Sequence, residues 1–596
     1  MSSANDISAL EEIAVEFDLV SFDVFDTLLV WPYPSPGDFL DGLEAALRLP
    51  GFAAARRAAV SKAYATARGA GREEVTLEEI YAHTPYPRHV MQSELDRVRR
   101  VVAADAAAAA LWGRMKALGK KVVIASDMYY PEDFLKSLLE SNGISGWDGF
   151  YLSCTQMTRK DSGGMFARIM DDFHVAPDKM LHIGDNRASD VEAPARLGAV
   201  GMPWARAIDV FLDENGFVKR FLEARHGGGD EGRSLAGAVA AEWQAMRAGG
   251  YWFRLGALAG GVMAYAYARW LRSHIESGGF TDVLFVARDG FVVKKILEGM
   301  GVAAKLRYVY APRPVFAALT SDSGFSAAEV EMRRKWRVNL VNRRCGPISI
   351  DAARRYVETG MADDQLSAAI RRAADEANRD FRAYLGNECR VDGRACVVDG
   401  FSRSFSAQRL LSEFLGERLH AFYFAALSPC EDADAFLFAP KRIPAFWALG
   451  EFLFGAPHPT AEDVVDGRPV YGDVNSFCER RRVEVFEEVV AGAVDMAAGL
   501  SRRGLDVSNG TLADWMNAFA FNPQPEDRFH LEEVRGMALG KSYSIVPDRS
   551  RRVKWIRFLG IPLAKSVREW QGADNVRLLT LFGKIPILRR TYPAWA

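Results

Sequence analysis

The sequence predicts an α/β protein with two α/β regions and a helical, basic C-terminal region. Short apolar runs that end in polar loops recur between residues 18 and 205, with helical segments between them. The same alternation returns between residues 235 and 475. From about Glu479 the chain reads as helical and then becomes basic and aromatic. Alternating strands and helices favour parallel sheets covered by helices, and residues 226–233, rich in glycine, are typical of a linker between the two regions.

The composition sets limits on size and partners. A chain of 596 residues, 49% of them hydrophobic, is too long for one core and predicts two to four domains. The 75 Lys and Arg nearly balance the 77 Asp and Glu, so the net charge of −2 gives no support for a nucleic-acid partner. The six cysteines show no CxxC pair or other close metal-ligand spacing.

The expected location is the cytoplasm. The first residues, MSSANDISALEEIAVEFD, are acidic and contain no apolar core of a signal peptide. The most apolar helical stretch, 255–268, lies between Arg254 and Arg269 and is too short to cross a bilayer. We expect it to be a buried helix.

The first apolar run, residues 19–22, ends abruptly in Asp23, which is followed by Asp26 and Thr27 in the stretch VSFDVFDTLL. Such a run predicts a buried parallel strand, and open α/β sheets carry their chemistry at the C-terminal ends of strands. A carboxylate here is thus a candidate functional group. The alternative is that Asp23 and Asp26 only cap the next helix.

Three later segments strengthen the functional interpretation. After helix-favouring, alanine-rich residues 31–110, which indicate a helical insertion, a second strand at 121–125 ends in Ser126 and Asp127. Lys160 comes just before a glycine pair and a helix. A third strand at 181–183 leads into GDNRASD, which contains Asp185 and Asp190.

These polar residues have complementary roles in one kind of reaction, attack on a group that carries an oxyanion. Asp23 is a candidate nucleophile, Ser126 a hydroxyl donor to an oxyanion, and Lys160 its positive clamp. Asp185 and Asp190 are oxygen ligands suited to a hard cation such as Mg²⁺. Taken singly, each residue also fits a structural role as a helix cap, a surface lysine or a solvated turn.

DVFDTLL, VVIASDM, the lysine segment and HIGDNRASD resemble, in order and spacing, the four motifs of the haloacid dehalogenase (HAD) superfamily, over residues 18–205. The resemblance implies a Rossmann-like core with a helical cap inserted after the first motif and Asp23 as nucleophile. It also implies Mg²⁺ held by Asp23, the Phe25 carbonyl and Asp185 or Asp190. The expected substrate contacts in this region are Thr27, Asp127 and Asn186. SFDVFDTLL with SDMYYP resembles the subgroup found with bacterial surface-polysaccharide genes, often beside glycosyltransferases.

One position departs from the superfamily pattern. Phosphatases of this superfamily carry a second aspartate two residues after the nucleophile, which protonates the leaving group, and Phe25 stands there. Asp26 is one place further along, where the family usually has glycine, and a shift of one residue on a tight loop should point its side chain elsewhere. Loss of general acid catalysis costs about 10²- to 10⁴-fold in rate.

The second region offers four strand candidates and two polar strand ends. The candidates are residues 283–286, 308–310, 395–398 and 421–424. The polar residues expected on loops after two of these strands are Arg288, Asp289, Asp399, Ser402, Arg403 and Ser404. Backbone N–H groups and a helix N-terminus at such loops bind anions. If the two strands are neighbours, the loops open on one edge and form one cationic cleft for a phosphate. The alternative is two ordinary strand-to-helix turns.

ARDG and VDGFSRS resemble the second half of the same polysaccharide-associated proteins, and VVDGFSRSFS resembles loosely the phosphate loop of phosphoribosyltransferases. In the tail, residues 549–570 mix basic and aromatic side chains, as at an anionic membrane surface. Docking on the protein itself or on a partner is the alternative that we favour.

The predicted organisation is a HAD-like domain at 1–225 with its cap at about 31–110, a second α/β domain at 235–475 and a helical, basic region at 479–596. The expected function is Mg²⁺-dependent hydrolysis or phosphotransfer on a phosphorylated or nucleotide-linked sugar during surface polysaccharide synthesis. The alternatives are a non-catalytic scaffold that binds a phosphorylated ligand, and a glycosyl or phosphoribosyl-type transferase in the second domain. Expected partners are the sugar substrate, glycosyltransferases and, through the tail, the inner face of the membrane.

Overall fold

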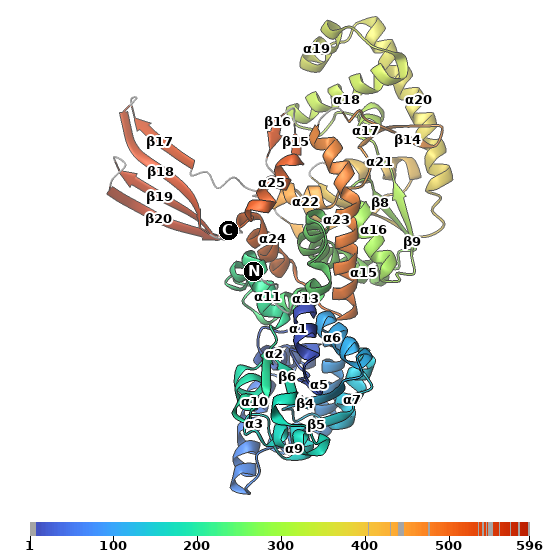
Figure 1. Cartoon of the computed structure of the whole chain (residues 1–596). Helices are drawn as coiled ribbons and strands as arrows, with labels where there is room; N and C mark the ends of the chain where they lie inside the picture. The colour runs from blue at the N-terminus through green and yellow to red at the C-terminus, as the bar shows by residue number, and fades with distance from the viewer. Residues whose placement is uncertain are drawn as a thin grey trace. The chain divides into compact units, whose positions relative to one another are not determined.

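The chain, seen in a computed structural model, divides into two compact units (Figure 1). The first unit comprises residues 1–248 and 502–507, and the second comprises residues 249–501 and 508–596. The structure describes residues 7–402, 405–429, 431–438, 446–474, 477–534, 536–538, 541–543, 545, 552–558, 561–571, 574–581 and 585–593, and beyond Val534 it describes a side chain only at Ile545.

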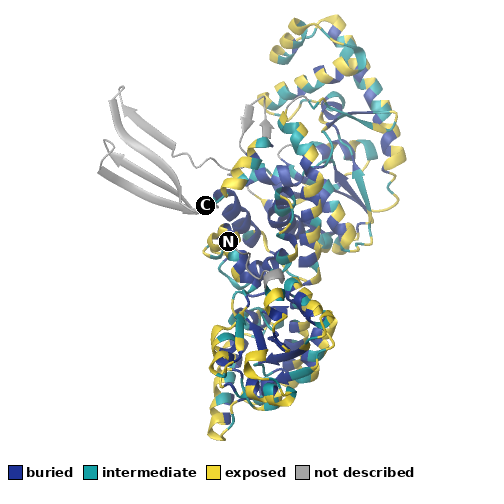
Figure 2. Cartoon of the chain, viewed as in Figure 1, coloured by how far each residue is buried: buried dark blue, intermediate teal, exposed yellow. Residues whose placement is uncertain are grey.

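A five-stranded parallel sheet forms the core of the first unit. Its order is β5-β4-β1-β6-β7, which in chain order of these strands is 3-2-1-4-5, the Rossmann arrangement. The strands are β1 (Leu19–Phe22), β4 (Lys121–Ser126), β5 (Gly149–Leu152), β6 (Met180–Gly184) and β7 (Val200–Pro203). Alternate side chains enter two separate apolar clusters, one on each face of the sheet, and Figure 2 shows this buried centre in dark blue.

Helices surround this sheet on both faces. They are α1 (Ile7–Ala14), α7 (Glu132–Ser141), α8 (Ser153–Gln156), α9 (Gly164–Phe173), η1 (Pro177–Lys179), η2 (Arg187–Glu192), α10 (Ala193–Arg196), α11 (Ala207–Glu214), α12 (Gly216–Leu222) and α13 (Asp230–Met246). Parallel strands need such crossover connections, because each strand must return to the same end of the sheet.

The predicted helical insertion follows β1. It contains α2 (Pro36–Leu47), α3 (Phe52–Gly69), α4 (Leu77–Tyr81) and α5 (Arg88–Val101), and α6 (Ala106–Ala117) leads back to β4. Two short antiparallel strands, β2 (Leu29–Val30) and β3 (Ala103–Ala104), pair at its base. We call α2 to α5 the cap.

The second unit contains another five-stranded parallel sheet, ordered β12-β11-β10-β8-β9. Its strands are β8 (Asp282–Val286), β9 (Lys305–Val309), β10 (Ala395–Ser402), β11 (His420–Ala426) and β12 (Ala433–Phe438). Read from β9, the chain order is 2-1-3-4-5, so the winding direction reverses between β8 and β10. Ligands bind at this switch point in doubly wound folds.

Most of the second unit is helical. Its helices are α14 (Tyr251–Leu255), η3 (Gly256–Gly261), α15 (Val262–Gly278), α16 (Gly290–Gly299), α17 (Arg313–Leu319), α18 (Ala327–Cys345), α19 (Ile350–Thr359), α20 (Asp364–Glu388), α21 (Ser406–Leu415), α22 (Trp447–Leu453), α23 (Phe477–Arg502), α24 (Asn509–Phe521) and α25 (Pro525–Glu533). The apolar stretch predicted as a buried helix forms η3 and the start of α15 and is buried, as expected. A Cβ at Gly492 would lie 1.9 Å from the Phe253 carbonyl oxygen, so glycine permits this helix contact.

The other strands of the described residues are antiparallel. They are β13 (Ala461–Val465), β14 (Arg468–Tyr471), β15 (Gly536–Ala538), β16 (Lys541–Tyr543), β17 (Arg552–Phe558), β18 (Ile561–Gln571), β19 (Asp574–Leu581) and β20 (Ile585–Pro593). β17 to β20 pair in sequence as one sheet.

The predicted α/β fold class is confirmed, with two parallel sheets and helices throughout. The C-terminal region is helical through α23 to α25, as expected, but the expectation of helix is wrong for the basic segment that follows, which forms strands. Residues such as VKWIRF mix polar and apolar side chains with a period nearer two than about 3.6, which is typical of a strand.

The glycine-rich stretch at 226–233 is packed rather than extended. A Cβ at Gly227 would meet the Phe221 carbonyl oxygen at 1.9 Å, and α13 begins directly after it and contacts α2 and α11. Helix α13 therefore belongs to the first unit, whose first segment ends at Ala248. None of the described helices combines the length and the apolar character needed to cross a bilayer.

Candidate active site

The candidate active site lies at the C-terminal edge of the first sheet. Asp23 follows β1, Ser126 ends β4, and Asp185 follows β6. β1 pairs with both β4 and β6, so the three residues come from adjacent strands. β1 and β6 also flank the point at which the strand order reverses. The sheet thus assembles the residues that the sequence singled out.

Lys160 is the centre of the charged cluster. Its Nζ lies 2.9 Å from Asp23 Oδ1 and 2.6 Å from Asp190 Oδ1, and the lysine is 2% exposed. Burial opposes the positive charge, but Asp23 and Asp190 outweigh it and raise the pKa of Lys160 above its usual value. Lys160 is therefore a permanent cation beside the candidate nucleophile.

Both carboxylate oxygens of Asp190 have polar partners. Besides Lys160, its carboxylate accepts hydrogen bonds from the Asn186 backbone N–H (2.8 Å) and the Ser189 hydroxyl (3.0 Å), and His182 Nε2 lies 3.3 Å away. Burial would raise the pKa of Asp190, but these contacts hold it below its usual value. A Cβ at Gly184 would lie 2.4 Å from Asp190 Oδ2, so glycine makes room for this carboxylate. Asp190 mainly positions Lys160.

Asp185 has the opposite electrostatic character. Burial, together with the charges of Asp23, Asp26 and Asp190, raises its pKa to about 8. Burial also raises the pKa of Asp23, although Lys160 opposes that effect. Burial and mutual repulsion thus disfavour negative charge on both carboxylates, and a bound cation would offset these effects.

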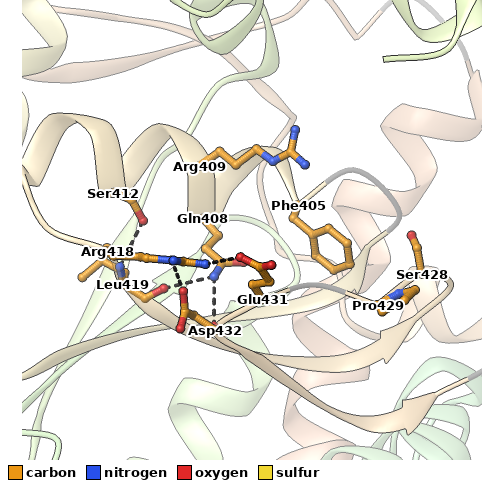
Figure 3. A pocket seen from close by; sticks show the side chains of 10 residues that line it. All are labelled: Phe405, Gln408, Arg409, Ser412, Arg418, Leu419, Ser428, Pro429, Glu431 and Asp432. Carbon is orange, nitrogen blue, oxygen red and sulfur yellow. Dashed lines mark hydrogen bonds and ion pairs between the residues drawn. The ribbon is translucent and has the colours of Figure 1, made fainter. Parts of the chain in front are cut away.

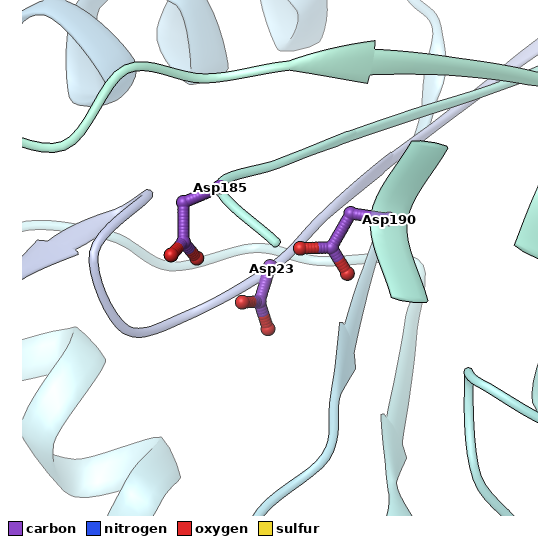
Figure 4. Close-up of side chains that lie close together, drawn as sticks. All are labelled: Asp23, Asp185 and Asp190. Atoms are coloured by element: carbon purple, nitrogen blue, oxygen red, sulfur yellow. The ribbon is translucent and has the colours of Figure 1, made fainter. Parts of the chain in front are cut away.

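The acidic residues fit a divalent cation. Asp23, Asp185 and Asp190 each offer an oxygen, and the three oxygens lie within 4.8 Å of one another (Figure 4). Figure 4 shows the three side chains converging from separate backbone segments. Hard oxygen ligands in small number, completed by water and substrate, suit Mg²⁺. Because the oxygens of Asp190 already hold other partners, Asp23 and Asp185 are the better ligands, with the Phe25 carbonyl as the expected third.

Phe25, two residues after Asp23, carries an apolar ring and no proton donor. Its ring contacts Trp31 edge-on with centroids 5.2 Å apart and Tyr130 at 6.1 Å. Asp26 adopts a left-handed conformation (φ 56°), and its Oδ1 accepts a hydrogen bond from the Trp31 backbone N–H at 3.2 Å. Its carboxylate is thus tied to the loop, and burial raises its pKa to about 7.

The remaining predicted contacts of this site occupy different positions. Asp127 Oδ1 accepts the Lys160 backbone N–H at 2.9 Å, and burial raises its pKa to about 6. Thr27 is fully buried, and its hydroxyl has no hydrogen-bond partner among the described residues. The side-chain oxygen of Asn186 accepts the backbone N–H groups of Ala188 and Ser189, so it caps η2.

Sequence reasoning missed Arg159, whose guanidinium joins the cap to Asp127. It also missed His182, which lies 2.9 Å from the Ser21 hydroxyl through Nδ1 and near Asp190 through Nε2. The Arg-Lys pair before the glycines was a signal for Arg159. His182 falls within an apolar strand and gives little signal from sequence.

In the second unit, β8 and β10 are neighbouring parallel strands, as the shared-cleft hypothesis requires. Asp399 and Ser402 lie within β10 rather than on a loop after it, because β10 pairs with β11 as far as Ser402. The expectation of a loop there is therefore wrong. The Ser402 hydroxyl accepts the Phe405 backbone N–H at 3.0 Å. Arg403 and Ser404 lie outside the described residues.

Arg288 is not a free cation, because its Nη1 lies 2.7 Å from Glu479 Oε1. Asp289 Oδ2 accepts the Phe401 backbone N–H at 3.2 Å, and a Cβ at Gly400 would lie 2.4 Å from that oxygen. Burial and the charge of Asp399 raise the pKa of Asp289 to about 7, and burial raises that of Asp399 to about 6. Among the described residues, neither aspartate has an ion-pair partner.

A separate cavity of about 600 Å³ lies beside α21 and the end of β11 (Figure 3). Its charges are largely paired: Arg418 lies 2.6 Å from Glu431 and also contacts Asp432. Gln408 donates to the carbonyl oxygens of Leu419 and Asp432, both at 3.0 Å. None of the predicted site residues that the structure describes lines this cavity.

No family model matches the sequence, and no curated protein matches it. Solved structures similar to this chain include an L-2-haloacid dehalogenase from Xanthobacter autotrophicus, with 16% identity and a TM-score of 0.26 over 35% of this chain and 84% of that one. A predicted phosphoglycolate phosphatase from Haemophilus somnus shares 16% identity, with a TM-score of 0.24 over 33% and 91%. A HAD phosphatase from Thermococcus onnurineus shares 17%, with a TM-score of 0.22 over 30% and 83%. Similarity at this level identifies no activity, so the function rests on the geometry of the site.

Proposed function

We propose that the first unit is a Mg²⁺-dependent hydrolase or phosphotransferase that attacks phosphorus through Asp23. The observation that carries this proposal is the position of Lys160 between Asp23 and Asp190, with Asp185 beside them. A nucleophilic carboxylate, a fixed cation and a metal-ligating carboxylate are the groups that stabilise a phosphoryl group during transfer.

Each residue would have a defined role. An oxygen of Asp23 forms a bond to phosphorus as the bond to the leaving oxygen breaks, and water then hydrolyses the resulting acyl phosphate or another acceptor takes the phosphoryl group. Lys160 and the Ser126 hydroxyl bind the phosphoryl oxygens, and Asp190 keeps Lys160 in place. Mg²⁺, when bound by Asp23, the Phe25 carbonyl and Asp185, neutralises charge on the phosphoryl group.

The apolar residue at position 25 bears on the choice of substrate. Phe25 cannot donate a proton, and the Asp26 carboxylate is held by the Trp31 backbone. Leaving groups that depart as stable anions need no proton. A phosphoanhydride, as in a nucleotide-linked sugar, has such a leaving group, whereas a simple alkyl phosphate does not. This favours a nucleotide-linked sugar over a sugar monophosphate.

The proposed setting is the synthesis of surface polysaccharide, with glycosyltransferases as partners and contact with the inner face of the membrane through the basic tail. The motif resemblance supports this setting. In the second unit, Arg288, Asp289, Asp399, Ser402, Arg403 and Ser404 are the proposed substrate contacts. Their support is that β8 and β10 flank the switch point of the sheet. A transferase acting there is the second candidate function.

The test is a screen of the full chain against nucleotide sugars, sugar phosphates and p-nitrophenyl phosphate, with Mg²⁺ and with EDTA. Phosphate or nucleotide release that needs Mg²⁺ and is lost in Asp23→Asn supports the proposal. Ligand binding without turnover, equal in the wild type and in Asp23→Asn, would replace it with the scaffold function.

A further inference from the structure

Arg159 lies where the cap meets the core of the first unit. Its Nη1 is 3.5 Å from Glu74 Oε2 and donates to the Tyr64 hydroxyl at 3.3 Å, and its guanidinium lies 5.8 Å from the centre of the Tyr64 ring. Tyr64 belongs to α3, and Glu74 lies in the segment between α3 and α4. The Tyr64 hydroxyl also contacts Glu74. One side chain of the core thus binds two side chains of the cap.

The same guanidinium reaches toward the active site. Its Nη2 lies 3.7 Å from Asp127 Oδ2, while Asp127 Oδ1 accepts the Lys160 backbone N–H at 2.9 Å. Lys160 is the next residue after Arg159, and its Nζ contacts Asp23. Polar contacts therefore run without a gap from the cap, through Arg159 and Asp127, to the lysine beside the nucleophile.

Two carboxylates that Arg159 contacts are largely shielded from water. The Glu74 side chain is 1% exposed and that of Asp127 is 14% exposed. Among the described residues, Arg159 is the one ion-pair partner of each. Leaving a buried carboxylate without its cation is costly, so loss of Arg159 should weaken the seating of the cap. Exposed surface pairs carry no such penalty.

A second contact acts on the backbone of the same segment. The Glu73 carboxylate accepts the Arg159 backbone N–H at 3.3 Å and the Ser162 hydroxyl at 3.0 Å. The segment 159–162 is therefore bound to the cap through both a side chain and its backbone. Movement of the cap away from the core would pull on the turn that carries Lys160.

We propose that Arg159 is a positioning residue that couples closure of the cap to the placement of Lys160 beside Asp23. The inference rests on the proposed function, because Lys160 must act on the phosphoryl group for the coupling to matter. The cap then does more than cover the site. The lysine is held correctly only when the cap is seated on Arg159.

Two variants that differ in charge balance distinguish a positioning role of Arg159 from a purely structural one. Arg159→Gln removes the cation and leaves Glu74 and Asp127 uncompensated, whereas Glu74→Gln with Arg159→Gln removes one charge of each sign. The double variant should recover thermal stability. It should not recover turnover, because Asp127 and the 159–162 turn still lack the guanidinium.

The experiment measures kcat and KM for p-nitrophenyl phosphate with Mg²⁺, and the thermal midpoint, in the full chain. The control is Arg57→Gln, because Arg57 is an exposed arginine of the cap, on α3, whose ion pair with Asp41 at 2.8 Å stays within the cap. We expect the double variant to keep a kcat about a hundredfold below wild type, the cost of misplacing a catalytic group by about 1 Å. Recovery of kcat together with stability in the double variant overturns the proposal.

Hydrogen exchange separates this inference from the proposed function. If the wild type hydrolyses nothing and Asp23→Asn changes nothing, the proposed function fails. The coupling is still tested, because Arg159→Gln should speed amide exchange in both residues 70–76 and residues 159–163, while Arg57→Gln should not. Faster exchange in the cap segment alone contradicts the coupling, even in an active enzyme.

Discussion

The ammonium group of Lys160 lies 2.9 Å from Oδ1 of Asp23, so the candidate nucleophile and its positive partner are in contact before any substrate binds. Both side chains are almost wholly excluded from water, which disfavours charge on each of them, and their contact offsets part of that cost. Burial raises the pKa of Asp23, and the contact with Lys160 opposes that rise. For the proposed function, this contact places a cation beside the candidate nucleophile before an anionic group arrives.

The first prediction concerns Asp23. Asp23→Asn should reduce the hydrolysis of p-nitrophenyl phosphate by at least about 10⁴-fold, because the amide is nearly isosteric but is not nucleophilic. The fold should persist, as judged by circular dichroism. Asp18→Asn, at an exposed residue just before β1, is the matched control. Full activity in Asp23→Asn would rule out catalysis by this site.

The second prediction concerns the missing proton donor. Phe25→Asp should raise the rate on alkyl phosphates by about 10²-fold or more and should change the rate on p-nitrophenyl phosphate little, since that leaving group needs no proton. The comparison of kcat for the two substrates is the measurement. Phe25→Asn also removes the ring contacts with Trp31 and Tyr130, so its kcat shows the effect of losing those contacts alone. Equal behaviour of the Asp and Asn variants on alkyl phosphates would argue against the missing acid as the limit.

The third prediction separates the two aspartates that follow β6. Mg²⁺ at about 100 times its Kd should stabilise the folded first unit by about 2.7 kcal/mol. Asp185→Asn should abolish this stabilisation, and it should not lower the thermal midpoint without metal because it relieves repulsion with Asp23. Asp190→Asn should lower the metal-free midpoint, since Lys160 loses its closest partner. A Mg²⁺-dependent shift that survives Asp185→Asn would place the cation elsewhere.

The sequence predicted that Asp23, Ser126 and Asp185 lie together at strand ends, because each strand end follows from a local pattern. Asp23, Ser126 and Asp185 each follow or end an apolar run, and parallel pairing brings such residues together whatever the loops do. The strand at 19–22 was predicted with its observed bounds. The strands β5 and β7 were missed, because GFYL and VGMP are short, partly exposed and contain glycine or proline.

What the sequence could not give is the set of contacts made across long separations. Arg159 and Glu74 are 85 residues apart, and neither shows its partner in the local pattern. The same holds for Arg288, whose pairing with Glu479 joins residues 191 apart. A polar residue at a strand end predicts where a functional group lies. Whether a cation such as Arg288 is free to bind a ligand depends on the ion pairs that packing creates.

The last prediction concerns pH and the two aspartates of the second unit. Burial and mutual repulsion raise the pKa of Asp289 to about 7, and burial raises that of Asp399 to about 6, so both bind a proton more readily in the folded than in the unfolded chain. Their contribution to stability is therefore complete below about pH 4 and is lost as pH rises through about 6 to 7.

Asp399→Asn removes one of these protons and one charge, so it should flatten the fall in the thermal midpoint between pH 5 and pH 8. Asp375→Asn, at an exposed residue of α20 away from both aspartates in sequence, should leave the profile of the wild type unchanged. The measurement is the thermal midpoint of the second unit across this pH range at constant ionic strength. A wild-type profile that does not fall, or an Asp399→Asn profile as steep as that of the wild type, would show that these carboxylates do not repel one another in solution.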